Sequence, residues 1–246
     1  MCLKGKRILV VGASSDLAVD LNRMLIESGA IVGLHYNKNR TALYSYKNSS
    51  VIKKFKKNLN NSKACYNIID EFVKWARGID CLVQLSGDIK KTVHWSDLKK
   101  KDWDCDMDNN LAMPFFLTQR VVYHMKMHGG KIVLMSTASA SHGGGVTSLA
   151  YGIAKAGIEC MVKGLTRDCA KYKILINAIA PGFINTKFHA QKMHKTKEQL
   201  KERVELIPLK RAGTTKEFAE TVMFLLSDGA SYITGQTMTM SGGDWL

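Results

Sequence analysis

Tyr151 and Lys155 are the pair of side chains in this sequence with the clearest chemical use. A spacing of four residues places both on one face of a helix. Free tyrosine is a poor base at neutral pH because its pKa is near ~10, but a neighbouring ammonium favours the ionised phenol and lowers that pKa. The pair therefore predicts a tyrosine that exchanges a proton with a bound molecule. A surface helix pair without a function is the alternative interpretation.

A glycine-rich turn at Gly12–Ala18 is the second candidate site, because it follows the apolar run Ile8–Val11 and opens a helical pattern. Such a turn lets backbone N–H groups and the positive end of a helix face a pyrophosphate. Asp16 and Ala18 stand where glycines are expected. Ala18 still allows close packing of helix on strand, whereas Asp16 either caps the helix or repels a phosphate. An ordinary strand-to-helix turn is the alternative.

Short apolar runs alternate with amphipathic segments along the chain. The predicted strands are Arg7–Val11, Ile31–Tyr36, Val51–Phe55, Ile79–Leu85, Lys131–Met135, Leu175–Ala180 and Thr237–Met240, and the predicted helices are Asp16–Ser28, Cys65–Arg77, Met107–Met127, Ala150–Tyr172 and Lys216–Ser227. This alternation predicts an α/β fold, a Rossmann-type doubly wound parallel sheet of about seven strands with helices on both faces. Such a sheet binds ligands at the carboxyl ends of its strands.

The length of 246 residues suits one well-buried domain, and no composition break marks a boundary. No apolar run is long enough for a signal-peptide core or a bilayer span, so we expect a soluble, cytoplasmic protein without a membrane partner. The six cysteines, Cys2, Cys65, Cys81, Cys105, Cys160 and Cys169, are widely spaced. We expect reduced, mostly buried thiols and no metal site.

The net charge of +15, from 36 Lys and Arg against 21 Asp and Glu, favours acidic partners such as phosphorylated cofactors, acyl carriers, sugar nucleotides or nucleic acid. The Lys-rich stretches 53–57, 90–101 and 192–201 lack the interleaved aromatic residues or Arg pairs of a nucleic-acid surface. We therefore interpret them as a solvated surface and expect no nucleic-acid partner.

The segment Lys131–Thr186 resembles the short-chain dehydrogenase/reductase family. It carries the family's Tyr-x-x-x-Lys pair at Tyr151 and Lys155, followed by a segment, Asn177–Thr186, that also looks like the family's. The C-terminal stretches Ile207–Gly213, Tyr232–Gln236 and Ser241–Gly243 are similar to its last helix and strand. The resemblance covers essentially the whole chain and is greatest to 3-oxoacyl-[acyl-carrier-protein] reductases and similar carbonyl reductases.

This resemblance implies an oxidoreductase that interconverts a carbonyl and an alcohol with a nicotinamide cofactor. Tyr151 would give its proton to the substrate oxygen while the carbon receives hydride, and Lys155 would also contact the nicotinamide ribose. Asn110 matches the Asn that kinks a helix and holds a water of the proton relay.

The family's Ser that hydrogen-bonds the substrate oxygen aligns with Thr137. Thr137 stands fourteen residues before Tyr151, one more than the resemblance implies, so Ser136 and Ser139 stay alternatives. A strand-end hydroxyl that only satisfies backbone groups is the other interpretation.

The resemblance implies cofactor contacts at Gly12, Ser14, Ser15, Asp16, Leu17, Asn37, Lys38, Asn58, Leu59, Ser86, Gly87, Tyr151, Lys155, Pro181, Gly182, Ile184 and Thr186. One segment departs from the family pattern, because Gln84–Gly87 replaces Asn-Asn-Ala-Gly. Gly87 keeps the close approach of the backbone to the cofactor, but the Asn that ties the central strands together is absent.

The loop His35–Arg40 follows the second predicted strand, where an acidic residue would bind the ribose hydroxyl of NAD. It contains no acid, and Lys38 and Arg40 could meet a 2′-phosphate instead. We therefore expect NADP(H) to be favoured over NAD(H), the alternative being two solvated loop charges.

The segment at about 187–210 lies where the family has a mobile element that covers the substrate. Its His189 and His194 could meet an anionic substrate, although scattered histidines are more often surface residues. We expect a small-molecule or carrier-linked carbonyl substrate, with 3-oxoacyl thioesters leading, and a homotetramer. The competing hypothesis is a cofactor-binding protein with reduced or lost catalysis that acts as a regulator or partner, motivated by Asp16, the segment 84–86 and the displaced hydroxyl.

Overall fold

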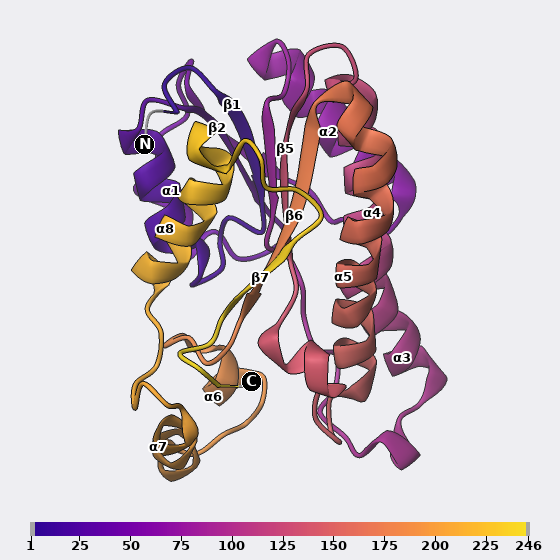
Figure 1. The fold of residues 1–246 in the computed structure, drawn as a ribbon, viewed down its shortest axis with the longest axis vertical. Coiled ribbons are helices and arrows are strands. Elements are labelled where there is room, and N and C mark those ends of the chain that lie inside the picture. The colour runs from indigo at the N-terminus through magenta and orange to yellow at the C-terminus, as the bar shows by residue number, and fades with distance from the viewer. Residues whose placement is uncertain (1–2, 245–246) are drawn as a thin grey trace.

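The structure is a computed structural model that describes residues 3–244, and its centre is a parallel sheet of seven strands (Figure 1). The strands are β1 (Arg7–Val11), β2 (Ile31–Tyr36), β3 (Ile52–Lys56), β4 (Cys81–Gln84), β5 (Gly130–Met135), β6 (Ile174–Pro181) and β7 (Thr237–Met240). Their order across the sheet is β3-β2-β1-β4-β5-β6-β7, and every neighbouring pair is parallel. The predicted doubly wound sheet is confirmed.

Helices cover both faces of the sheet, as Figure 1 shows. The helices α1 (Ala18–Glu27) and α8 (Thr215–Leu226) pack together on one face, and α2 (Ser62–Ala76), α4 (Met113–Met125) and α5 (Leu149–Cys169) lie on the other. Strand β1 serves both layers, because Ile8 and Val10 join the core cluster under α1 and α8 while Leu9 and Val11 join the opposite one. A strand buried on both faces must be apolar along its buried length, as β1 is from Ile8 to Val11.

The predicted helix Met107–Met127 is wrong in its extent, because three elements occupy this part of the chain. These are α3 (Lys100–Met107), a π-helical turn η3 (Asp108–Ala112), and α4. Pro114 explains the break, since it lacks the N–H that would bond to the carbonyl four residues earlier, at Asn110. Single π turns often mark functional sites.

The boundaries of the other helices differ from the predicted ones by fewer residues. Helix α2 begins at Ser62, where Asn61 caps it by accepting the N–H of Ala64, and α5 ends in the 3-10 turn η5 (Ala170–Tyr172). The segment 187–210 contains two helices that the sequence analysis did not predict, α6 (Phe188–Gln191) and α7 (Lys197–Leu206). The remaining 3-10 turns are η1 (Thr41–Leu43), η2 (Trp95–Asp97), η4 (Ala138–His142) and η6 (Asp228–Ala230).

The cysteines follow the expectation in part. Cys65, Cys81 and Cys169 are buried, Cys105 is half-buried, and Cys160 is exposed, while Cys2 lies outside the described residues. Within residues 3–244, no helix has both the length and the apolar character needed to cross a membrane.

Candidate active site

A cavity of about 360 Å³ lies at the carboxyl ends of the central strands. Among the predicted site residues, those that line it are Ser14, Ser15, Asp16, Leu17, Gly87, Ser136, Thr137, Ser139, Tyr151, Lys155, Pro181, Gly182, Ile184 and Thr186. Predicted residues that do not contribute to its wall are Gly12, Asn37, Lys38, Asn58, Leu59, Ser86 and Asn110. Side chains from five separate parts of the chain therefore meet at one place.

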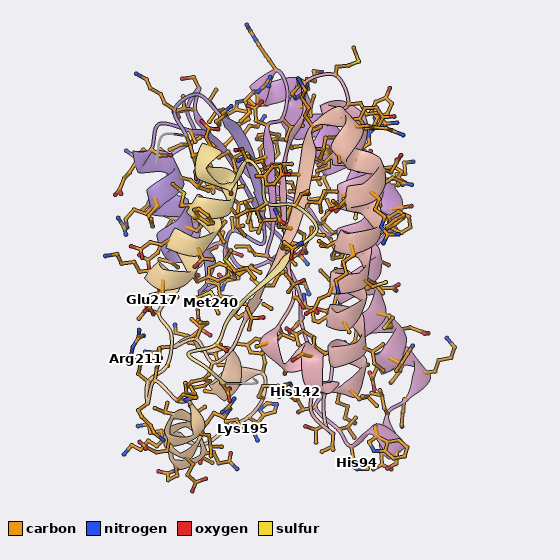
Figure 2. All side chains as sticks on the ribbon, viewed as in Figure 1. His94, His142, Lys195, Arg211, Glu217 and Met240 are labelled. Atoms are coloured by element: carbon orange, nitrogen blue, oxygen red, sulfur yellow. The ribbon has the colours of Figure 1, made fainter. Side chains whose placement is uncertain are left out.

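A second cavity of about 570 Å³ adjoins the first, because Thr137, Ser139, Ser148, Gly182 and Met193 line both. Its outer wall is formed by 144–147 and by the helix α7. Figure 2 shows Lys195, which also lines this second cavity, and His142 at the same end of the molecule. The first cavity contains Tyr151 and the turn at Ser14–Leu17, and the second continues from it without Tyr151 in its wall.

The turn after β1 is held in place by its neighbours. Gly12 has a φ of +85°, and a Cβ on it would lie 2.7 Å from the backbone nitrogen of Ser86, so only glycine fits this approach of two loops. The Gly12 N–H donates to Nδ1 of His35 at 3.2 Å, while Nε2 of the same ring lies 3.0 Å from the carbonyl oxygen of Lys57. His35 is buried, and burial lowers its pKa. No motif in the sequence marks this role of His35.

The residues of this turn fit a dinucleotide pyrophosphate. Ser15, Asp16 and Leu17 line the cavity at the beginning of α1, where the N–H groups of Ala18 and Val19 donate to the carbonyls of Ser15 and Asp16. The buried Oγ of Ser15 has no hydrogen-bond partner within residues 3–244, which leaves a hydroxyl ready for a ligand oxygen.

Asp16 does not cap α1, so that part of the expectation is wrong. The N-cap position belongs to Leu17, and no side chain caps this helix. Instead, Oδ2 of Asp16 accepts the backbone N–H of Lys187 at 3.0 Å. Its carboxylate is therefore engaged with the segment 187–210.

Tyr151 and Lys155 lie one turn apart on α5, as the spacing predicts. The Nζ of Lys155 is 5.6 Å from the centre of the Tyr151 ring and donates to the Met135 carbonyl at 2.9 Å. Lys155 is 1% exposed, and burial lowers its pKa to about 7. Burial, followed by the charges of Asp106 and Asp88, raises the pKa of Tyr151 above its usual value.

The expectation that the ammonium of Lys155, together with the positive nicotinamide of an oxidised cofactor, lowers the pKa of Tyr151 stays a prediction. Burial disfavours the ammonium of Lys155, so the positive charge that would favour the phenolate is itself destabilised in the protein without cofactor. The protein's own groups therefore favour the neutral, proton-donating form of Tyr151.

Asn110 lies in the π turn η3 and is fully buried. Its Nδ2 donates to the backbone carbonyls of Asp88 at 2.7 Å and Asp106 at 2.9 Å, and its Oδ1 accepts the N–H of Asp88 at 3.2 Å. A Cβ on Gly87 would lie 2.7 Å from this Oδ1 and 3.2 Å from Nζ of Lys155. Gly87 thus allows Asn110 and Lys155 to approach the same point.

The three candidate hydroxyls have different surroundings. Ser136 is buried and donates to Oε1 of Glu159 at 2.7 Å, so its hydroxyl is already used. Thr137 and Ser139 line both cavities, and their Oγ atoms lie 3.3 Å apart. The hydroxyl of Thr137 also lies 3.5 Å from the Pro181 carbonyl.

Gln84 takes a local role where the family has a bridging Asn. Its Nε2 donates to the carbonyl oxygen of Ser86 at 2.6 Å and to the Oγ of Ser86 at 2.8 Å. The Oε1 of Gln84 is buried and has no hydrogen-bond partner within residues 3–244. The side chain therefore fixes the turn before Gly87.

The predicted cofactor contacts Asn37, Lys38, Asn58 and Leu59 lie at the carboxyl ends of β2 and β3. Nδ2 of Asn37 donates to Oδ1 of Asn58 at 3.2 Å, and Leu59 is buried in the core beside them. Lys38 is exposed, and the guanidinium of Arg40 lies 5.3 Å from the centre of the Tyr44 ring.

The segment 187–210 forms one side of both cavities. Phe188, Gln191, Lys192 and Met193 line the first, although the sequence analysis did not name them. Lys192 also pairs with Asp88 on the loop after β4, at 2.8 Å. The side chain of His189 lies outside the described residues, and His194 is exposed.

A cavity at the carboxyl ends of a doubly wound sheet, lined by a tyrosine and a lysine one helical turn apart, is typical of a nicotinamide-dependent oxidoreductase. A sequence profile described as "Enoyl-(Acyl carrier protein) reductase" matches residues 12–244. The chain belongs to the short-chain dehydrogenase/reductase family and is an NAD(P)(H)-dependent enzyme acting on CH–OH and C=O groups.

Characterised relatives resemble the chain over nearly its whole length. It is 33% identical to nodulation protein G of Rhizobium meliloti, covering 98% of this chain and 97% of that protein. It is 32% identical to the 3-oxoacyl-[acyl-carrier-protein] reductase of Thermotoga maritima, covering 99% of each. The solved structure of a short-chain dehydrogenase/reductase from Serratia marcescens has the same fold, with a TM-score of 0.88, 22% identity and complete coverage of both chains.

Proposed function

We propose that the protein is an NADP(H)-dependent reductase of 3-oxoacyl thioesters, with Tyr151 as the proton donor. The observation that carries this proposal is the meeting of Tyr151, Lys155 and Thr137 with the turn at Ser15 in one cavity. The nicotinamide, when bound, supplies the hydride. The predicted cofactor contacts, the single domain and the covering role of the segment 187–210 belong to the same proposal.

Three side chains act on the substrate oxygen and its proton. Thr137 donates a hydrogen bond that holds the carbonyl oxygen, and the O–H bond of Tyr151 breaks as the new alcohol O–H bond forms. Lys155 and Asn110 would resupply the proton to the phenolate by way of water, as the family resemblance implies. The neutral form of Tyr151 that the site favours suits the reduction direction.

The shape of the second cavity, the net charge of the protein and its similarity to a named reductase support this substrate class. The second cavity extends away from Tyr151 and offers apolar contacts from Val146, Leu200 and Leu206, which suit an acyl chain. The net charge of +15 suits an acidic carrier. The reductase of Thermotoga maritima is named for 3-oxoacyl-[acyl-carrier-protein] reduction. No observation favours the alternative of a protein without catalysis.

The test is consumption of NADPH and NADH against a panel of carbonyl compounds that includes 3-oxoacyl thioesters on a carrier and on a small thiol. Tyr151→Phe keeps the ring and removes the proton donor, so turnover should fall by orders of magnitude while cofactor affinity stays nearly unchanged. Near-normal turnover of this variant would contradict the assigned chemistry.

The preference for NADP(H) rests on Lys38 and Arg40. Each charge-assisted hydrogen bond to a 2′-phosphate contributes roughly 1.5–3 kcal/mol when well placed, and exposure reduces that figure. Replacing both residues by Ala should weaken NADPH binding about tenfold and leave NADH binding nearly unchanged. The matched control is the pair Lys4→Ala and Lys6→Ala, which removes the same charge near the opposite ends of the strands. Tighter binding of NADH than NADPH to the unmodified protein would refute the preference.

A further inference from the structure

Asp16 is the acidic residue in the wall of the first cavity, and the proposed chemistry gives its charge no role. Among the described residues that line this cavity, no other is an acid. Asp16 stands next to Ser15, whose buried hydroxyl has no partner within residues 3–244. None of the ion pairs in the described part of the chain includes Asp16. An unpaired carboxylate in a turn suited to a pyrophosphate weakens anion binding there and therefore calls for a function.

The Asp16 carboxylate contacts a part of the chain that is distant in sequence. Its Oδ2 accepts the N–H of Lys187 at 3.0 Å, and Lys187 is the residue from which α6 begins. The backbone just before Lys187 is fixed against Gly213, which donates its N–H to the Phe183 carbonyl and accepts the N–H of Asn185, both at 2.9 Å. The Asp16 bond therefore lies where the fixed backbone ends and the segment 187–210 begins.

Beyond Lys187 this segment is held by polar contacts rather than by a core. None of the side chains of α7 is buried, and Arg203 pairs α7 with Asp244. Lys192 pairs with Asp88 at 2.8 Å, and both side chains are nearly half exposed, with 48% and 44%. An element with few buried apolar contacts opens at a low cost in free energy. Release of one polar contact is therefore enough to loosen the start of the segment.

We propose that Asp16 is a positioning residue that couples the pyrophosphate position of the cofactor site to the substrate-covering segment. This inference rests on the proposed function, because it assumes a dinucleotide at the turn after β1. The Asp16 carboxylate holds the Lys187 N–H while the turn is empty. Beside a pyrophosphate it is repelled, and it lowers that repulsion by turning away, which releases the Lys187 N–H.

The coupling has two consequences that can be measured. The Lys192–Asp88 pair lies on the loop after β4 and is retained, so it becomes the contact that keeps the segment near the cavity once Asp16 has turned away. By thermodynamic linkage, the bond to Lys187 and the cofactor must weaken each other by the same factor. Removing the charge of Asp16 should therefore strengthen cofactor binding.

Hydrogen exchange of the unmodified protein tests the first consequence without any turnover. Saturating NADPH should speed exchange of the Lys187 amide about three- to tenfold, while the amides of Asn185 and Gly213 stay protected. Exchange at Lys187 that is unchanged or slower with NADPH would overturn the inference.

Asp16→Asn tests the second consequence, because it keeps an oxygen acceptor for the Lys187 N–H and removes the charge. Calorimetry should show a dissociation constant for NADPH about three- to tenfold lower, with a smaller difference at high salt. NADH carries the same pyrophosphate and should gain by a similar factor, which separates this effect from the preference assigned to Lys38 and Arg40. NADPH should no longer speed exchange at Lys187 in this variant. Unchanged affinity for both cofactors would refute the coupling.

Asp20→Asn is the matched control. Asp20 lies one turn further along α1, where it is bonded to Arg23 and Thr215 and makes no contact with the segment. This variant should gain less than about twofold in cofactor affinity and should keep the NADPH-dependent exchange at Lys187. An equal gain in both variants would show a general effect of charge near α1 and would overturn the role of Asp16.

The proposed function fails by different results. Near-normal turnover of Tyr151→Phe would reject the chemistry assigned to Tyr151 and leave the coupling intact, because binding and exchange do not depend on turnover. A protein that binds neither NADPH nor NADH would reject both. Normal binding of NADPH with unchanged exchange at Lys187 would reject the coupling alone.

Discussion

At the scale of single residues, burial and charges from distant parts of the chain shift the pKa values of Tyr151 and Lys155. The spacing of Tyr151 and Lys155 was enough to place them on one face of a helix, because helical geometry is local. The pKa of each depends on burial and on Asp88 and Asp106, which come from other parts of the chain. The direction of the shift in Tyr151 was therefore beyond the reach of spacing alone.

The role of Thr137 gives a prediction about the substrate oxygen. Thr137→Val keeps the shape of the side chain and removes its hydrogen bond, so turnover should fall roughly ten- to a hundredfold. Ser139→Ala should cost less, because Ser139 lies further along the cavity wall, in the turn η4. Steady-state kinetics of the two variants make the comparison, and the opposite ranking would transfer the role to Ser139.

Ser136→Ala is expected to act on stability rather than on the chemical step. Its hydroxyl is bonded to Glu159 inside the protein, so its loss leaves that carboxylate without a donor. We expect about 1 kcal/mol of lost stability in chemical denaturation with nearly normal turnover. A large fall in turnover at unchanged stability would show that Ser136 contacts the substrate.

The buried Lys155 predicts how the stability of the cofactor-free protein depends on pH. Its pKa is about 7 in the folded state against 10.5 in the unfolded state, so between these values only the unfolded chain binds the proton. The free energy of unfolding should therefore rise with pH from about 7 by up to ~1.4 kcal/mol per pH unit. Denaturant titrations at pH 7 and 9, with Lys155→Met as the reference, measure this difference. Equal pH dependence in the two proteins would contradict a buried, weakly basic lysine.

At the scale of elements, the strands were predicted within one or two residues. Because these strands are buried on both faces, they appear in the sequence as apolar runs between polar segments. The π turn at Asp108–Ala112 was not predicted, because hydrophobic periodicity does not distinguish a π turn from a regular helix. Helices α6 and α7 were not predicted either. They line a cavity and are not buried in a core, so their sequences have only a weak apolar periodicity.

The segment 187–210 provides a prediction about an element. It is joined to the cofactor side of the site by the Lys192–Asp88 ion pair and by the Asp16 bond to the Lys187 N–H. Both carboxylates are exposed enough that each contact is weak, about 1 kcal/mol or less. Lys192→Met should therefore raise KM for the carbonyl substrate a few-fold and speed proteolysis within this segment.

The matched control for this prediction is Lys100→Met, which breaks an exposed, hydrogen-bonded pair with Asp104 on α3. It should change neither KM nor the rate of proteolysis. Equal effects of the two substitutions would show that the loss of any surface cation suffices, and that the pair with Asp88 does not hold the segment in place.

At the scale of the whole molecule, the fold explains why the site could only partly be located from sequence. The order of the strands brings the turn after β1 next to the loop after β4, so Gly12 meets Ser86. It also brings Asp16 against Lys187, far along the chain. Contacts of this kind follow from topology rather than from local sequence pattern. From the sequence alone, Asp16 is therefore only a departure from the expected glycine, whereas in the structure it connects two loops.

The last prediction concerns assembly into a homotetramer. Large apolar side chains remain exposed on the layer of α4 and α5, at Tyr123 with 62% and Ile153 with 39%, while Tyr232 before the edge strand β7 is fully exposed. A tetramer with two kinds of two-fold contact would cover both places, which are separate on the surface. Sedimentation at micromolar concentration should therefore give a tetramer for the unmodified protein.

Substitution at one contact should leave the other intact. Tyr123→Asp and Tyr232→Asp each place a charge within a contact that would otherwise be apolar, so each variant should sediment as a dimer, and the double variant as a monomer. The control is Val51→Asp. Val51 lies before β3, the opposite edge strand, and is 45% exposed. This variant should remain tetrameric. A monomeric unmodified protein would contradict the assembly, whereas a tetramer unaffected by either substitution would place the contacts on other faces.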